Sequence, residues 1–168
     1  AKNLCRTWKF QSVAYSLKAG GYTAFDFKAN SMRELATKMK AKMKELASKN
    51  GEEWTQEDED EWNEQIQYAY KEQPERLTFA ASGYMYARFG DNNVERGKWR
   101  MPLANKLQLW NLDEERWSDE FFLSIEDTAL EEGTSETVSE VKGNTLTITQ
   151  TLRGSEGGVI KYSMTFTK

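Results

Sequence analysis

The chain has 168 residues and a formal net charge of −4, and 30% of its residues are charged. This length favours a single domain, and 6 Trp, 7 Tyr and 8 Phe supply enough apolar surface for a core. The sequence contains no His and one Cys, which excludes His-based triads, His-ligated metals and an intramolecular disulfide. No apolar run approaches the ~20 residues that a membrane-spanning helix needs. Composition therefore argues against most enzyme classes.

The N-terminal residues 4–16 alternate between apolar and polar side chains, which predicts a β-strand. Trp8 and Phe10 fall on its apolar side. Cys5 is expected to be a small packed hydrophobe rather than a lipid-acceptor site. The chain opens with Ala1-Lys2 and has no apolar signal segment, which we interpret as the mature form of an exported protein.

A change of hydrophobic period at Ser31 predicts two helices, residues 32–49 and 56–72, because apolar residues then recur at steps of three and four. Ser31 and the Glu three positions later form a capping box. Residues 31–49 carry six Lys/Arg against two Glu, a charge of +4, and residues 50–73 carry nine acids against one Lys, a charge of −8. With a short turn between them, the basic and acidic helices should lie antiparallel as a helical hairpin.

Short runs of β-branched and aromatic residues, separated by Gly/Asn turns, follow the hairpin. They predict seven further strands at residues 77–79, 84–89, 97–101, 107–109, 121–125, 146–148 and 160–166. The polar residues 131–140 are interpreted as a connection. Together with the first strand they make eight, which favours an antiparallel meander closing into a barrel.

The order and spacing of these strands carry a family resemblance. Leu4-Cys5-Arg6-Thr7-Trp8-Lys9, Gly97-Lys98-Trp99, Gly143-Asn144-Thr145-Leu146-Thr147-Ile148 and Tyr162-Ser163-Met164-Thr165-Phe166 resemble strands of bacterial lipocalin-like proteins. Arg6 stands where that family usually has Gly before Thr-Trp. The resemblance covers residues 4–16 and 76–167 and skips the hairpin.

The resemblance implies a fold that is mainly β: an eight-stranded antiparallel lipocalin-like barrel with an inserted α-helical hairpin between strands 1 and 2. The chain is then a single domain, residues 1–168, in which residues 31–73 are the insertion. The resemblance also implies a secreted, periplasmic or outer-membrane-associated protein of the bacterial envelope, with a lipid anchor upstream of the given chain. It implies binding of a small apolar ligand and carries no catalytic set.

Strand alternation nominates the residues that would face such a ligand. If the registers hold, large apolar side chains point inward, and tyrosine hydroxyls supply the polar contacts that orient a ligand. The expected ligand-binding residues are Trp8, Phe10, Phe79, Tyr84, Tyr86, Trp99, Met101, Tyr162 and Met164. Their bulk leaves open an alternative, a filled barrel with no cavity.

Other patterns point to structure rather than chemistry. The acidic residues 57–61 lack the Gly of a calcium loop and suit a helix start; residues 91–93 suit a turn. Net negative charge opposes a nucleic-acid partner. We expect no metal, no cofactor and no catalytic residue, and therefore a non-enzymatic binding protein. Two alternatives stay open: an envelope protein-protein interaction module that docks through the hairpin, and an enzyme that uses carboxylates on neighbouring strands.

Overall fold

Ten antiparallel strands and a helical hairpin make up the protein in its computed structural model, which describes residues 2–20, 22–128, 130 and 132–168. The hairpin consists of α1 (Met32–Lys49) and α2 (Gln56–Tyr68) and ends in the 3-10 turn η1 (Ala69–Glu72). A second 3-10 turn, η2 (Ile125–Asp127), precedes β8. The strands are β1 (Thr7–Ala19), β2 (Tyr22–Ala29), β3 (Pro74–Phe79), β4 (Tyr84–Phe89), β5 (Val94–Arg100), β6 (Gln108–Asn111), β7 (Arg116–Ser118), β8 (Gly133–Lys142), β9 (Thr145–Gly154) and β10 (Val159–Thr167).

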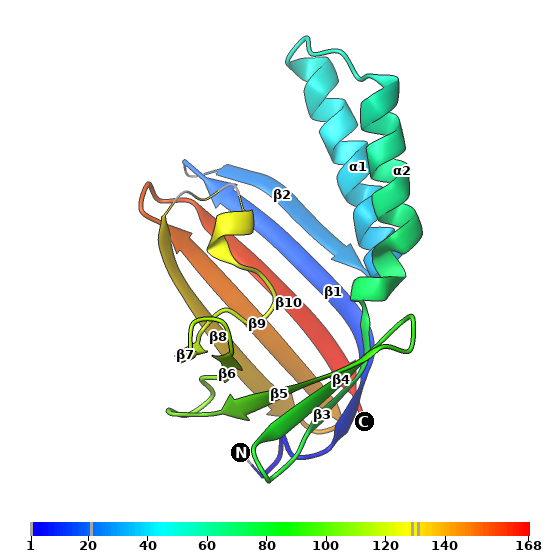
Figure 1. Cartoon of the computed structure of the whole chain (residues 1–168). Coiled ribbons are helices and arrows are strands. Elements are labelled where there is room, and N and C mark those ends of the chain that lie inside the picture. Colours follow the sequence, from blue (N-terminus) through cyan, green and yellow to red (C-terminus); the bar gives the residue numbers. More distant parts are fainter. Residues whose placement is uncertain (1, 21, 129, 131) are drawn as a thin grey trace.

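The strands form one sheet in the order β7-β6-β5-β4-β3-β1-β10-β9-β8, and β2 also pairs with β1. β1 is long enough to hold two partners on one side, since residues 7–9 pair with β3 and residues 13–19 pair with β2. The sheet curls into an open half-barrel (Figure 1). In the described part of the chain, a single bridge between Lys106 and Val138 joins its two ends. The predicted closed, eight-stranded barrel is therefore wrong in strand number and in closure.

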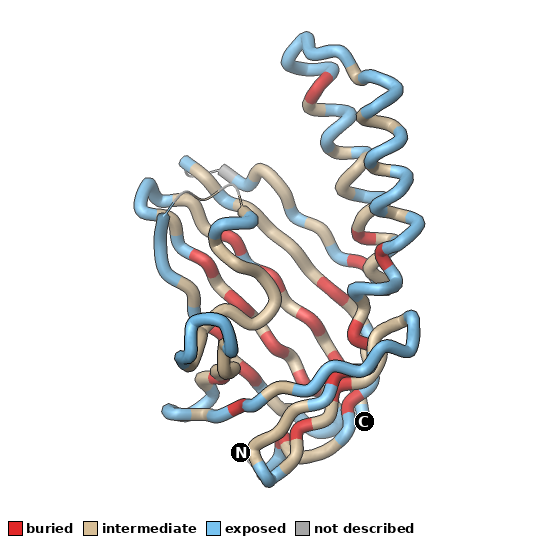
Figure 2. Tube along the Cα trace, in the orientation of Figure 1, coloured by how far each residue is buried: buried red, intermediate tan, exposed pale blue. Residues whose placement is uncertain are grey.

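The hydrophobic core lies on the inner, concave face of this sheet. Alternation along β9 buries Leu146, Ile148, Gln150 and Leu152, and the threonines between them take the opposite face. β10 follows the same pattern, and Figure 2 shows the buried positions repeating along the inner strands. The apolar alternation therefore fixes which side of the sheet faces the core.

The two predicted helices are confirmed, and their starts follow from local capping. The Ser31 side chain accepts a hydrogen bond from the Glu34 N–H, and Thr55 and Asp58 form a capping box at the start of α2. Lys40 Nζ lies 2.6 Å from a Glu59 carboxylate oxygen, so the basic helix does lie against the acidic one. Residues 69–72, predicted as the last turn of the second helix, form η1 instead.

The predicted position of the hairpin is wrong by one strand. Residues 22–29 form β2, so the hairpin connects β2 to β3 and not the first two strands of the sheet. It stands at the rim of the half-barrel beside β2, and its far end projects away from the sheet (Figure 1). Among the described residues, no helix combines the length and apolar character that crossing a bilayer requires.

Two further corrections concern the predicted strands. Residues 121–125 are not a strand, because the backbone N–H groups of Phe122 and Leu123 bond to the side chain of Gln150 instead of a neighbouring strand. Residues 133–142 form β8, although residues 131–140 read as a polar connection; residues 129 and 131 lie outside the described residues. The alternation of β8 is hidden because two of its buried positions are the polar residues Thr137 and Ser139.

Candidate functional site

A cavity of about 600 Å³ lies on the inner face of the half-barrel, and we call it the barrel chamber. Strands β3 to β6 and β10 supply its apolar wall, and its charged lining residues are Lys71, Glu72, Glu95 and Arg96. The apolar lining residues are Met32, Pro74, Leu77, Met85, Ala87, Phe89, Leu109, Phe121, Phe122, Leu123 and Met164. This volume is in the range of pockets that hold small organic ligands.

One wall of the chamber is a segment without regular strand structure, residues 119–127, which we call the strap. Gln150 on β9 is fully buried and holds the strap by its amide group. Its Oε1 accepts hydrogen bonds from the N–H groups of Phe122 and Leu123, each at 2.8 Å, and its Nε2 donates to the Leu123 carbonyl at 2.7 Å. The hydroxyl of Thr137 on β8 donates to the Asp119 carbonyl at 2.6 Å. The strap is therefore tied by polar side chains that point inward from β8 and β9.

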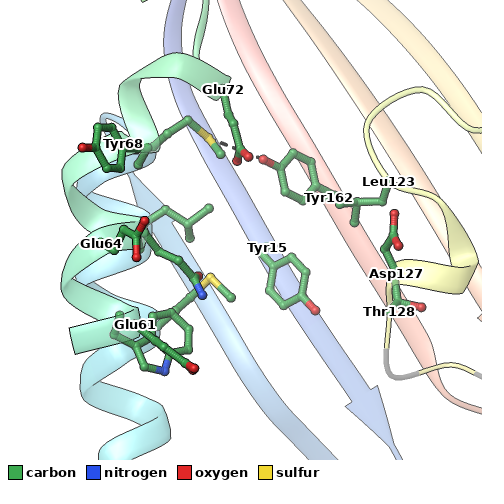
Figure 3. A pocket seen from close by; sticks show the side chains of 16 residues that line it. Tyr15, Glu61, Glu64, Tyr68, Glu72, Leu123, Asp127, Thr128 and Tyr162 are labelled. Atoms are coloured by element: carbon green, nitrogen blue, oxygen red, sulfur yellow. Dashed lines mark hydrogen bonds between the residues drawn. The ribbon is translucent and has the colours of Figure 1, made fainter. Parts of the chain in front are cut away.

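A second cavity, of about 720 Å³, lies between the hairpin and the inner face, and we call it the hairpin groove. Met32, Leu35 and Met39 of α1 and Trp62 of α2 form its helical side. The residues that face them across the groove are Tyr15, Tyr162, the strap residues Leu123 and Asp127, and Thr128 directly after the strap (Figure 3). Leu35 is buried and Met43, further along α1, is 39% exposed. Only the base of the apolar stripe on α1 therefore packs at the site.

Tyr162 stands where the two cavities meet. Both are lined by Tyr162, Met32, Glu72 and Leu123. The Tyr162 hydroxyl donates to the Met32 sulfur at 3.4 Å (Figure 3), and its ring contacts Phe122 at a centroid distance of 5.2 Å. Burial raises the pKa of the Tyr162 hydroxyl, and the negative charge of Glu72 raises it further, so the group is a neutral donor at physiological pH.

The charged residues among those that line the hairpin groove are all acidic. These are Glu61, Glu64, Glu72 and Asp127 (Figure 3). Among the described residues, no ion pair engages any of the four, because the lysines of α1 pair with Glu34, Glu45 and Glu59. The groove therefore has an aromatic and aliphatic floor under a negative rim.

The structure brings few of the predicted site residues to these cavities. Of the nine, Tyr162 and Met164 line the barrel chamber. Trp8 and Phe79 are buried in the core, where Phe79 contacts the Trp99 ring edge-on at 5.2 Å. Phe10 and Met101 are partly buried and pack against that core. The inward orientation expected of these residues holds, but most of them support the chamber instead of lining it.

Of the three tyrosines expected to orient a ligand, Tyr84 and Tyr86 lie on the outer face of the sheet. On β4, Met85 and Ala87 line the chamber, so Tyr84 and Tyr86 point to the opposite side of the sheet. Tyr86 is 38% exposed, and the guanidinium of Arg96 lies 5.0 Å from the centre of the Tyr84 ring. The error is a one-residue slip in the expected register of this short strand.

Sequence reasoning also missed residues that shape the site. Gln150 has the same strand parity as Ile148 and Leu152, and a polar residue at an inward position signals a buried polar contact. Met32 begins the predicted helix 32–49, and in the structure it contacts Tyr162 and lines both cavities. No sequence pattern places it there, because the contact joins residues 130 positions apart.

The lining of the two cavities combines apolar side chains, the neutral Tyr162 phenol and carboxylates. Among the described residues, no group of three His, Cys, Asp or Glu side chains is arranged to hold a metal ion. Apolar walls, one neutral phenol and a polar rim can hold and orient an apolar molecule. Comparison of this chain with protein-family models, with curated proteins and with solved structures finds no match in any of the three.

Proposed function

We propose that this protein is a non-enzymatic binding protein that holds a small apolar ligand in the barrel chamber, with the Tyr162 hydroxyl as the polar contact. The observation that carries the proposal is the chamber itself: about 600 Å³ with apolar walls, bounded by a strap that Gln150 ties in place. A placement in the bacterial cell envelope belongs to the same proposal. It rests on the sequence resemblance to lipocalin-like proteins alone.

The size and lining of the chamber favour such a ligand over a filled core. Protein interiors are close-packed, and voids larger than a water molecule are few in a domain. A chamber lined by Leu77, Met85, Ala87, Phe89 and Leu109 exposes apolar surface that a ligand would remove from water. Each Å² so buried contributes about 25 cal/mol. Ligand binding therefore lowers the free energy of the open half-barrel, whereas a filled barrel has no exposed apolar wall for a ligand to cover.

Charge narrows the class of ligand. Glu72 lines both cavities, and Glu61, Glu64 and Asp127 border the adjoining hairpin groove. The chamber itself has two cations, Lys71 and Arg96, beside two carboxylates, Glu72 and Glu95, so its own charges balance. The carboxylates of the hairpin groove repel an anionic headgroup that reaches the groove, so for such a ligand a neutral or cationic polar end is favoured. The neutral tyrosine hydroxyl can donate to an ether, carbonyl or hydroxyl oxygen of that molecule.

A neutral fluorescent probe, N-phenyl-1-naphthylamine, tests the proposal with three phenylalanine variants. Gly97→Phe fills the barrel chamber, because Gly97 lines it and a Cβ there meets nothing within 4 Å. Ala36→Phe fills the hairpin groove, which Ala36 lines. Lys98→Phe is the matched control, since Lys98 follows Gly97 on β5 and points to the opposite face.

The proposal predicts saturable probe binding that Gly97→Phe weakens at least tenfold and Lys98→Phe leaves unchanged. Ala36→Phe should have a smaller effect, because it fills only the neighbouring groove. Probe binding that Gly97→Phe does not alter would reject the barrel chamber as the site. A loss in Ala36→Phe alone would move the ligand to the hairpin groove.

A second candidate is a protein-protein interaction module that docks through the hairpin. The observation in its favour is that the far half of the hairpin projects beyond the sheet and leaves Met43 39% exposed (Figure 1). This reading predicts no saturable probe binding by the wild-type protein. The probe titration therefore separates the two functions.

A further inference from the structure

The outer face of strands β1, β3, β4 and β5 carries a concentration of positive charge. Strand pairing places Lys9 opposite Arg76, and Arg76 opposite Arg88, so three cations stand side by side across three strands. Their chain neighbours Trp8, Leu77 and Ala87 are buried in the core, which fixes these cations on the outside. We call the set the basic face; its members are Lys9, Arg76, Arg88, Arg96, Lys98 and Arg100.

Nothing in the described structure neutralises this charge. In the paired rows, the outward positions beside the six cations are Thr7, Thr78, Tyr84, Tyr86, Val94 and Gln108, and none is acidic. Among the described residues, no ion pair engages a member of the basic face. Like charges directly opposite each other on neighbouring strands are destabilising. The row Lys9, Arg76, Arg88 therefore lowers the stability of the isolated protein, and a negative surface laid against it would remove that cost.

Aromatic rings hold two of the guanidinium groups in place. Arg96 lies over the ring of Tyr84 at 5.0 Å, and Arg100 lies over the ring of Trp117 at 4.5 Å. Cation–π contact restricts a long side chain without neutralising its charge. Arg100 also donates from Nε to Gln108 Oε1 at 2.8 Å. Both guanidinium groups are thus held on the outside and keep their positive charge for an anionic partner.

Exposed aliphatic side chains accompany the cations. Val94 lies in the same cross-strand row as Arg88 and is 59% exposed. Leu103 and Leu112 lie in the loops after β5 and β6, and both are more exposed than Val94. Tyr86, which is 38% exposed, lies opposite Arg96. Lysines and arginines mixed with tyrosine and exposed aliphatic side chains are the composition that suits a membrane interface.

We propose that the basic face docks the protein on an anionic lipid bilayer. The overall charge of −4 opposes long-range attraction, so the binding must come from this face alone. A single-stranded nucleic acid fits less well, because the face is the convex side of a curled sheet and the arginines occupy the rings of Tyr84 and Trp117 on which bases would stack. Except for Arg96, which also lines the barrel chamber, the members of the basic face lie on the opposite side of the sheet from the chamber, so docking leaves the chamber free.

Flotation with vesicles of phosphatidylcholine and phosphatidylglycerol in equal amounts tests the proposal. The test variant is R76Q/R88Q/R96Q. The matched control is K18Q/R153Q/K161Q, which removes the same charge from exposed positions elsewhere on β1, β9 and β10. The test variant should fold at least as stably as wild type, because it relieves the like-charge row; urea unfolding checks this.

The wild-type protein should float with these vesicles and not with vesicles of phosphatidylcholine alone. Because each cation near an anionic surface contributes about fivefold to binding, R76Q/R88Q/R96Q should bind about 100-fold more weakly. The control should bind within about fivefold of wild type, and added salt should release the protein. Val94→Ser should weaken vesicle binding and leave the salt dependence unchanged.

Three results would overturn the proposal. One is an absence of flotation with anionic vesicles at low salt. Another is that the test and control variants weaken vesicle binding equally, which would mean that the net charge of the protein, and not the basic face, determines binding. The third is tight binding of oligodeoxythymidylate that R76Q/R88Q/R96Q abolishes while vesicles do not bind, which would assign the basic face to single-stranded nucleic acid.

Discussion

The sharpest structural prediction concerns Gln150→Leu, which removes the amide that ties the strap to β9. Three hydrogen bonds between Gln150 and the strap backbone are lost, those to the N–H groups of Phe122 and Leu123 and that to the Leu123 carbonyl. A buried backbone group left without a partner costs about 1–3 kcal/mol. The low end of this range applies, because the backbone groups of a released strap can bond to water. Loss of the three hydrogen bonds should therefore lower the free energy of unfolding by about 3 kcal/mol.

Urea unfolding of wild type, Gln150→Leu and the matched control Thr151→Leu measures this loss. Thr151 is the next residue on β9 and faces outward, so its replacement should change stability by about 0.5 kcal/mol or less. Amide hydrogen exchange gives a local readout, since the Phe122 and Leu123 N–H groups should lose protection in Gln150→Leu. A loss below about 1 kcal/mol with protection retained would refute the account of the strap.

Three further predictions test the core, the base of the hairpin and the buried phenol. Trp8→Ala should cost about 4 kcal/mol in chemical denaturation, because the indole is fully buried; a loss near zero would mean that it does not pack in the core. Gly90→Ala should lose more than about 1 kcal/mol, since its Cβ would lie 2.2 Å from the Tyr70 carbonyl oxygen, whereas Gly97→Ala should be neutral. Because burial raises the pKa of Tyr162, the unfolded chain deprotonates first, so stability should fall as pH rises above ~10. Tyr162→Phe should flatten that fall in urea unfolding between neutral and alkaline pH, and an equal slope would contradict the assigned burial.

Local patterns in the sequence predict the elements whose environment is uniform along their length. The helix 32–49 and its Ser31 cap follow from period and capping alone, as does the alternation of β9 and β10. β8 escapes prediction because the polar residues Thr137 and Ser139 occupy buried inward positions, where the Thr137 hydroxyl bonds to the distant Asp119 carbonyl. A strand prediction from apolar alternation requires hydrophobic residues at the inward positions, and two of the inward positions of β8 are polar.

The site depends on contacts that no local pattern encodes. Residues 121–125 have the composition of a strand, but the buried amide of Gln150 takes the hydrogen bonds that a neighbouring strand would supply. The hairpin position depends on which strands share the long edge of β1. Tyr84 and Tyr86 were misplaced because a six-residue strand leaves its register open by one residue. Sequence therefore predicts the elements better than their pairing.

The central claim is that the barrel chamber holds a small apolar ligand, and native mass spectrometry tests it most directly. The wild-type protein and Gly97→Phe are purified without denaturation from the organism that makes the protein, and their masses are compared. The account predicts a non-covalent adduct with the mass of a small neutral or cationic lipid on the wild type, and none on Gly97→Phe. A bare wild-type protein, or an adduct that Gly97→Phe retains, would contradict it.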